Sequence, residues 1–188
     1  VIYRLKPDAQ RPEIFAGNPM FTSLRGVALS ADEKRVYFAD YDLGIFFFET
    51  DSRRGSVLRA PETLNLGGID GLYSWQGSLV AIQNGISPNR ILRLDLDESG
   101  TSVESIAPLS VALPEFETPT FGAMVDNRLV YLAASHWDKV DENGLPLDPP
   151  LPAIPVLSSA VDEAENLVVG KEMLEQLKQQ GRAVTPGG

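Results

Sequence analysis

The chain has 188 residues, a formal net charge of −10 and no cysteine. Hydrophobic residues make up 43% and charged residues 22%, which is typical of a folded globular protein. Phosphate binding needs clustered Lys and Arg, so this charge argues against nucleic acid as a partner. Without cysteine, disulfides, thiolate metal sites and a cysteine nucleophile are excluded. No apolar run approaches the about 18–20 residues of a membrane helix, so we expect no membrane partner.

Two short β-rich segments open the chain, at residues 2–5 and 12–15. The first, Ile-Tyr-Arg-Leu, is similar to Ile-Leu-Arg-Leu at residues 91–94. We interpret the pair as the two outer strands of a repeat unit that the chain enters midway. The sequence therefore leads us to expect that an N-terminal half of the fold is missing from this chain.

Three segments then repeat one pattern, in which an apolar strand with a glycine near its start is followed by a polar turn and a second β-rich strand. Gly26, Gly71 and Gly122 mark the three units. The period of about 45–50 residues suits four short strands, the size of a propeller blade. Outer strands are expected at residues 44–49 with 56–59 and at residues 90–96 with 103–106, where polar turns separate the β-rich runs.

We therefore predict an all-β fold, a partial β-propeller ring of about three blades over residues 1–145. The blade boundaries are expected at residues 1–17 for an incomplete blade, then 20–62, 66–110 and 116–145. Residues 146–188 are predicted to hold a Pro-rich connector up to residue 155, a last strand at 154–157, and a C-terminal helix at 163–180. The alternative for this end is a further hairpin, with strands at 159–162 and 167–170.

Blade geometry brings two sets of residues to one end of the central channel. The first set opens the inner strands and consists of Arg25, Asp70 and Phe121, each just before its glycine. The second set lies in the loops after the second strands, at residues 40–42, 83–84 and 135–138. Loops on a rigid scaffold are the usual place for sites. The candidate site residues are Arg25, Tyr41, Asp70, Gln83, Asn84, His136 and Trp137.

Several of these stretches resemble the gluconolactonase, senescence marker protein and luciferin-regenerating enzyme family of six-bladed β-propellers. Ile-Asp-Gly at residues 69–71 is similar to the family's Pro-Asp-Gly, and residues 25–30 with 37–40 are similar to its Asn-Gly-Leu-x-x-Ser…Tyr-x-x-Asp. The resemblance implies a six-bladed ring, Asp70 as a ligand of calcium or a similar divalent cation, and metal-assisted hydrolysis of a lactone or related ester. Arg25 departs from the family's Asn ligand, because a guanidinium has no acceptor for a cation.

Residues 79–85, 117–120 and 135–138 are similar to a bacterial, exported branch of that family. The resemblance therefore implies an exported or periplasmic protein. This localisation is an expectation from the resemblance, and no signal peptide is visible in the sequence.

Each candidate residue also has a structural interpretation. Asp70 is either a cation ligand or a cap on the turn before Gly71. Arg25 either binds an anionic substrate, such as a sugar-acid carboxylate, or forms an ion pair with Asp70. His136 is either a general base or a loop imidazole beside Trp137.

Two other motifs favour structural roles. Residues 95–100 and 141–144 resemble calcium-binding loops but lack the spacing and flanking helices of an EF-hand. We therefore predict hairpin turns at both places. The Phe run at 46–48 is expected in the core, because a strand between two neighbouring blades is apolar on both sides.

Two functions remain open for a small-molecule substrate or ligand. One is a hydrolase in which Asp70 and His136 act with a divalent cation. The alternative is a propeller that binds a small ligand or a protein without chemistry, which Tyr41, Gln83, Asn84 and Trp137 favour.

Overall fold

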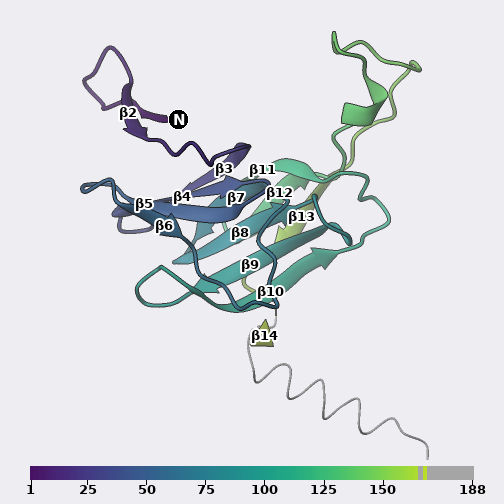
Figure 1. Cartoon of the computed structure of the whole chain (residues 1–188). Coiled ribbons are helices and arrows are strands. Elements are labelled where there is room, and N and C mark those ends of the chain that lie inside the picture. The colour runs from purple at the N-terminus through teal and green to yellow at the C-terminus, as the bar shows by residue number, and fades with distance from the viewer. Residues whose placement is uncertain (165–166, 169–188) are drawn as a thin grey trace, which may run out of the picture.

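The computed structural model of the chain describes residues 1–164 and 167–168. This part of the chain is all-β apart from a single 3₁₀ turn, η1 (Trp137–Lys139), which confirms the predicted fold class. Its strands form antiparallel sheets in which neighbours along the chain are hydrogen-bonded (Figure 1). No helix within these residues is long and apolar enough to cross a membrane.

The chain begins with an isolated hairpin of β1 (Ile2–Arg4) and β2 (Glu13–Ala16). The first blade is the four-stranded sheet of β3 (Leu24–Leu29), β4 (Arg35–Asp40), β5 (Gly44–Glu49) and β6 (Gly55–Val57).

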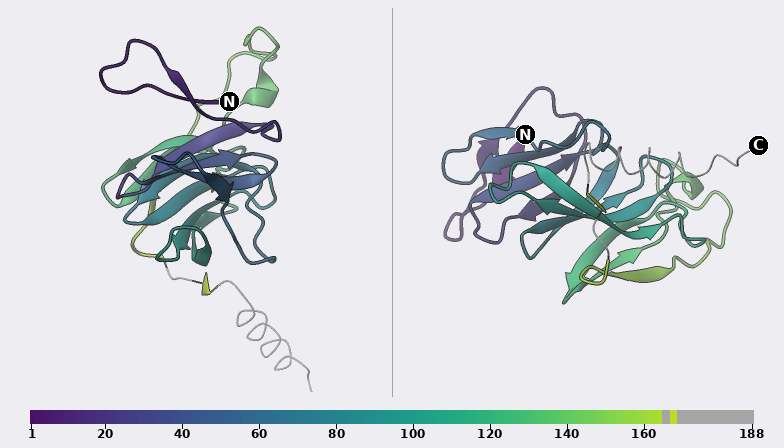
Figure 2. Two further views of the ribbon diagram at one scale, coloured as in Figure 1. Left: turned by 60° about the vertical axis from the view of Figure 1, so that its left-hand side comes forward. Right: turned by 90° about the horizontal axis from the view of Figure 1, so that it is seen from below.

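The second blade consists of β7 (Ile69–Trp75), β8 (Ser78–Gln83), β9 (Arg90–Leu96) and β10 (Val103–Val111), with β14 (Leu167–Val168) added on the outer edge of β10. The third blade consists of β11 (Thr120–Val125), β12 (Arg128–Leu132) and β13 (Val156–Ala160). Seen from below, the blades lie side by side in chain order, which is the arrangement of a partial β-propeller (Figure 2).

The inner strands share one irregularity. Their pairing with the second strand shifts register between Leu24 and Val27 in β3, between Ile69 and Gly71 in β7, and between Thr120 and Gly122 in β11. The repeated glycines therefore occupy equivalent places, as the sequence predicts. At Gly26 the reason for glycine is close approach of two blades, because a Cβ there would lie 2.5 Å from the backbone nitrogen of Leu72.

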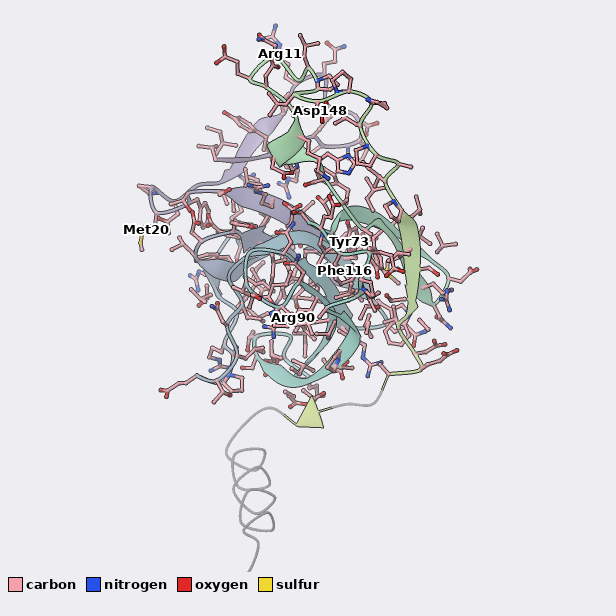
Figure 3. All side chains as sticks on the ribbon, turned by 90° about the vertical axis from the view of Figure 1, so that its right-hand side faces the viewer. Arg11, Met20, Tyr73, Arg90, Phe116 and Asp148 are labelled. Atoms are coloured by element: carbon pink, nitrogen blue, oxygen red, sulfur yellow. The ribbon has the colours of Figure 1, made fainter. Side chains whose placement is uncertain are left out.

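Two apolar cores hold the blades together. The core between the first and second blades includes Tyr37, Ile45 and Phe47 from one side and Leu72 and Leu92 from the other. A separate core joins the second and third blades. Its buried members are Val80, Ile82, Ile91, Leu129, Tyr131 and Val161, with Tyr73 and Phe116 packed against them (Figure 3).

The Phe run divides between the two faces of the first blade. Phe47 is buried in the first core, as predicted, but Phe46 and Phe48 are only half-buried on the opposite face. There they pack edge to face against Phe21. The alternation of side chains along a strand causes this division, since only one face of the blade lies under the second blade.

Beyond residue 133 the chain differs in detail from the sequence expectation. The third strand of the third blade runs from Val156 to Ala160 and pairs with β12 along its length. It therefore starts and ends later than the strand expected at 154–157. Leu167 and Val168 form β14 on β10, where a helix was expected. The free edge of β10 offers unpaired backbone groups that a short strand satisfies. From residue 169 on, the expected helix lies outside the described residues.

Candidate functional site

The N-terminal ends of the three inner strands meet at the carboxylate of Asp70. Arg25 Nη1, from β3, donates to Asp70 Oδ1 of β7 at 2.9 Å. Asp70 Oδ2 accepts from Thr120 Oγ1 of β11 and from Asn84 Nδ2 at 3.4 Å. The side chain of Asp70 is only 4% exposed, whereas that of Arg25 is 44% exposed. Asp70 therefore links all three blades from a buried position, and the side chain of Arg25 remains accessible to solvent.

A cavity of about 420 Å³ opens at this point, which we call the mouth pocket. Its lining residues come from all three blades and the loops beside them: Arg25, Tyr41, Asp70, Asn84, Thr118 and Trp137. The mouth pocket lies where the propeller geometry predicts that inner strands and loops converge.

The wall beside Arg25 is fixed by stacking and hydrogen bonds. The guanidinium carbon of Arg25 lies 4.7 Å from the centroid of the Tyr41 ring, within the range of a cation–π contact. Tyr41 OH donates to Asn84 Oδ1 at 3.0 Å, and Asn84 Nδ2 donates to Pro119 O at 2.9 Å. Arg25 Nε donates to Ser23 Oγ at 3.2 Å. These contacts hold Tyr41, Asn84 and Arg25 in place without any ligand.

Asp40 positions the loop that carries Tyr41. Its buried carboxylate accepts backbone N–H groups of Thr22, Ser23, Asp42 and Leu43 and the hydroxyl of Thr22. Burial by itself would raise the pKa of Asp40, but these hydrogen bonds outweigh it and lower the pKa below its usual value. The ionised carboxylate thus holds residues 40–43 in one conformation, a role that the sequence analysis did not foresee.

Two of the predicted site residues lie outside the mouth pocket. Gln83 is fully buried, donates to the carbonyls of Asn65 and Gly67 at 2.9 and 2.6 Å, and accepts from Arg90 Nε at 2.7 Å. The structure thus places Gln83 inside the second blade, next to Asn84 in the chain but turned away from the pocket.

His136 is also buried and is not among the residues that line the mouth pocket. Its Nε2 lies 3.8 Å from Glu117 Oε2, which also accepts from Lys139 Nζ. The exposed indole of Trp137 borders the pocket instead. His136 therefore lies beside Glu117, the chain neighbour of the pocket residue Thr118.

Sequence reasoning missed Thr118 and Thr120. It expected Phe121 next to Asp70, because Phe121 precedes its glycine as Arg25 and Asp70 do. The structure puts Thr120 there, and Phe121 is 59% exposed and does not line the mouth pocket. The run Glu-Thr-Pro-Thr at 117–120 was the available signal, since it leads into the inner strand of the third blade, which begins at Thr120.

The mouth pocket does not fit a divalent cation. Calcium takes about 6–8 oxygen ligands, and among the pocket's lining residues Asp70 is the one carboxylate. Its Oδ1 faces a guanidinium at 2.9 Å, and Asn84 Oδ1 already accepts from Tyr41. No group of three His, Asp or Glu side chains in the described part of the chain is arranged to hold a metal ion.

These features define a class: a partial β-propeller with a polar pocket where its inner strands begin. No family model matches the sequence, and no curated protein matches it. Among solved structures, a luciferin-regenerating enzyme superposes with a TM-score of 0.47 at 15% identity, over 79% of this chain and 48% of that chain.

The PQQ-bound form of an aldose sugar dehydrogenase from Streptomyces coelicolor superposes with a TM-score of 0.45 at 13% identity, over 73% of this chain and 42% of that chain. The chain thus spans less than half the length of both structures.

Proposed function

We propose that this chain is a ligand-binding part of a β-propeller, and that its mouth pocket takes a small organic carboxylate anchored by Arg25. The observation that carries the proposal is that the Arg25 guanidinium is held in place by the protein while its Nη2 has no acceptor in the described part of the chain. Asp70, Ser23 and Tyr41 fix it through Nη1, Nε and one face of the group. No acceptor within the described residues takes the hydrogens of Nη2, although Arg25 is half-exposed and lines the pocket.

The other groups of the mouth pocket fit the same ligand class. The indole N–H of Trp137 has no hydrogen-bond partner among the described residues, and Trp137 is 68% exposed. A flat indole offers apolar surface for a carbon skeleton and a donor at its edge. With Arg25 Nη2 and Trp137 as donors, the pocket complements an acceptor-rich molecule. Its volume of about 420 Å³ is within the range of small-ligand sites.

Charge sets the expected strength of binding. Asp70 neutralises much of the positive charge of Arg25, since the two groups are 2.9 Å apart. A carboxylate is then held by charge-assisted hydrogen bonds to a preorganised guanidinium, and not by a large net field. We therefore expect modest affinity that depends on the carboxylate.

The competing proposal is metal-assisted hydrolysis of a lactone or related ester, in which Asp70 binds a divalent cation. It is supported by the position of a buried carboxylate at the opening of β7. It requires the cation to displace Arg25, whose charge opposes it at short range. Binding without chemistry is therefore the function that the geometry supports best.

Calorimetric titration with gluconate and its neutral alcohol, sorbitol, tests the proposal. We expect gluconate to bind at least tenfold more tightly than sorbitol, and Arg25→Ala to remove this preference. Arg128→Ala is the matched control, because Arg128 is an exposed arginine of the third blade whose side chain, among the described residues, bonds only to Ser158. Equal binding of both probes, or an unchanged preference in Arg25→Ala, contradicts the proposal.

A calcium titration of the same proteins separates the competing function. Saturable calcium binding that Asp70→Ala removes, with no preference for gluconate, would favour the hydrolase.

A further inference from the structure

The loop between η1 and β13 carries an unusual apolar surface. We call residues 145–156 the strap; its sequence is Leu-Pro-Leu-Asp-Pro-Pro-Leu-Pro-Ala-Ile-Pro-Val. Every residue except Asp148 is apolar, and every residue except the half-buried Leu151 is exposed. Leu145, Leu147 and Val156 are 63%, 64% and 63% exposed. Contiguous exposed apolar surface of this kind is typical of sites that bind another protein.

The strap is held at its ends and unbonded between them. Leu147 N donates to Lys139 O at 2.9 Å, and Ala133 N donates to Pro155 O at 2.9 Å. Residues 148–154 make no backbone hydrogen bond within the described part of the chain and belong to no strand or helix. The loop projects away from the blades, with Asp148 at its outer end (Figures 1 and 3). The backbone of this stretch is therefore accessible to a partner.

Proline composition predisposes residues 150–155 of the strap to the polyproline II conformation, and the Pro149–Pro150 bond that precedes them is cis. Pro150, Pro152 and Pro155 lack an N–H group and have φ fixed near −65°. Polyproline II has three residues per turn, so residues three apart form one ridge. In that conformation Pro152 and Pro155 would share one ridge, and Ile154 would lie on the neighbouring one. Because the prolines are already restricted, little conformational entropy is lost when a partner binds.

The surroundings of the strap are acidic. Asp138, Asp141, Glu142 and Asp148 lie in or beside it. Lys139, the cation of this loop, is paired with Glu117. A partner with basic residues around its groove is therefore favoured during encounter and in the complex.

We propose that the strap is a docking segment for a partner protein with an aromatic-lined groove and a basic rim. Grooves of this kind accept exposed proline-rich segments in the polyproline II conformation. The proposal does not depend on the mouth pocket, since it rests on the strap residues alone. It gives this chain a second binding surface, for a protein and not for a small molecule.

Two isolated polyproline-binding domains serve as probes, a WW domain and an SH3 domain that each have basic residues around the aromatic groove. Each is isotope-labelled and titrated with the full chain by NMR. We expect at least one to bind saturably through its aromatic groove, more weakly as salt is added. The double variant Pro152→Ala, Pro155→Ala should lower the affinity at least tenfold. Pro12→Ala, at an exposed proline outside the strap, is the control and should bind like the wild type.

Arg25→Ala should retain binding of the probe, which distinguishes this proposal from the function of the mouth pocket. Circular dichroism of the double variant checks that its fold is intact, which is expected because both prolines are exposed. The proposal is overturned if neither domain binds the wild-type chain. It is equally overturned if the folded double variant binds as tightly as the wild type.

Discussion

The two faces of the first blade are alike in sequence and different in environment. On one face, Ala28, Tyr37 and Phe47 stand side by side across three strands and are buried under the second blade. On the other face, Val27, Phe38 and Phe46 form the neighbouring row. That outward row continues to Val57, and its two ends, Val27 and Val57, are 57% and 50% exposed.

This difference teaches that apolar character alone does not locate the core of a blade. Both rows are apolar enough to form a core, and only the presence of a neighbouring blade buries one of them. On the outward face, part of the cover comes from Phe15 of β2 and from Phe21, which contact Phe48. A hollow of about 470 Å³ remains there, lined mostly by apolar residues that include Phe21, Phe46 and Phe48.

The largest expected effect separates the two faces by stability. Ile45 is fully buried in the first core. We expect Ile45→Ala to lower the free energy of unfolding by about 2–5 kcal/mol, because it removes buried methyl groups and leaves a cavity. Val57→Ala, on the outward face, should cost no more than about 0.5 kcal/mol. Urea denaturation of both variants measures the difference, and similar losses would show that the outward face is also a packed core.

An intermediate effect concerns association. Exposed apolar faces of sheets attract each other in water, so we expect the isolated chain to self-associate through the outward face. The double variant Val27→Glu, Val57→Glu should weaken association at least tenfold, about 1.4 kcal/mol. Sedimentation velocity over a range of concentrations tests this. Arg128→Glu, on the third blade, is a control for added negative charge, and a monomeric wild type would contradict the prediction.

The smallest effect concerns Asp40, at the mouth end of the same blade. Hydrogen bonds lower its pKa in the folded state, so its ionised form stabilises the fold above the unfolded pKa of about 3.9. This contribution is lost as the pH falls through the lower, folded pKa. Asp40→Asn should therefore be less stable than the wild type at pH 7, with a difference that shrinks below about pH 4. Thermal unfolding across this range provides the measurement, and a difference independent of pH would refute it.

Much of the fold follows from local signals. Gly26, Gly71 and Gly122 recur at the same point of each inner strand, and polar turns separate the strands around them. Turn residues and period-2 alternation act over a few residues, so they are legible without tertiary information. The equivalent positions of Arg25 and Asp70 in successive blades also predict that the two side chains are neighbours. Their ion pair is one of the two roles that the sequence leaves open for Arg25.

The site was less accessible to sequence reasoning because adjacent residues point in opposite directions. Asn84 lines the mouth pocket while Gln83 is buried in the blade, and Trp137 borders the pocket while His136 does not. A one-residue shift exchanges such pairs. The bulge in β11 likewise places Thr120, not Phe121, at Asp70.

By itself, the sequence determined the all-β class, the repeat and the strands between residues 24 and 132, because alternation, turn residues and the glycines of the inner strands act locally. Tertiary structure alone decided which face of the first blade is core, which oxygen of Asp70 meets Arg25, and that the strap stays exposed. Those outcomes depend on contacts between residues far apart in the chain. Burial and hydrogen-bond partners exist only once the blades are packed together.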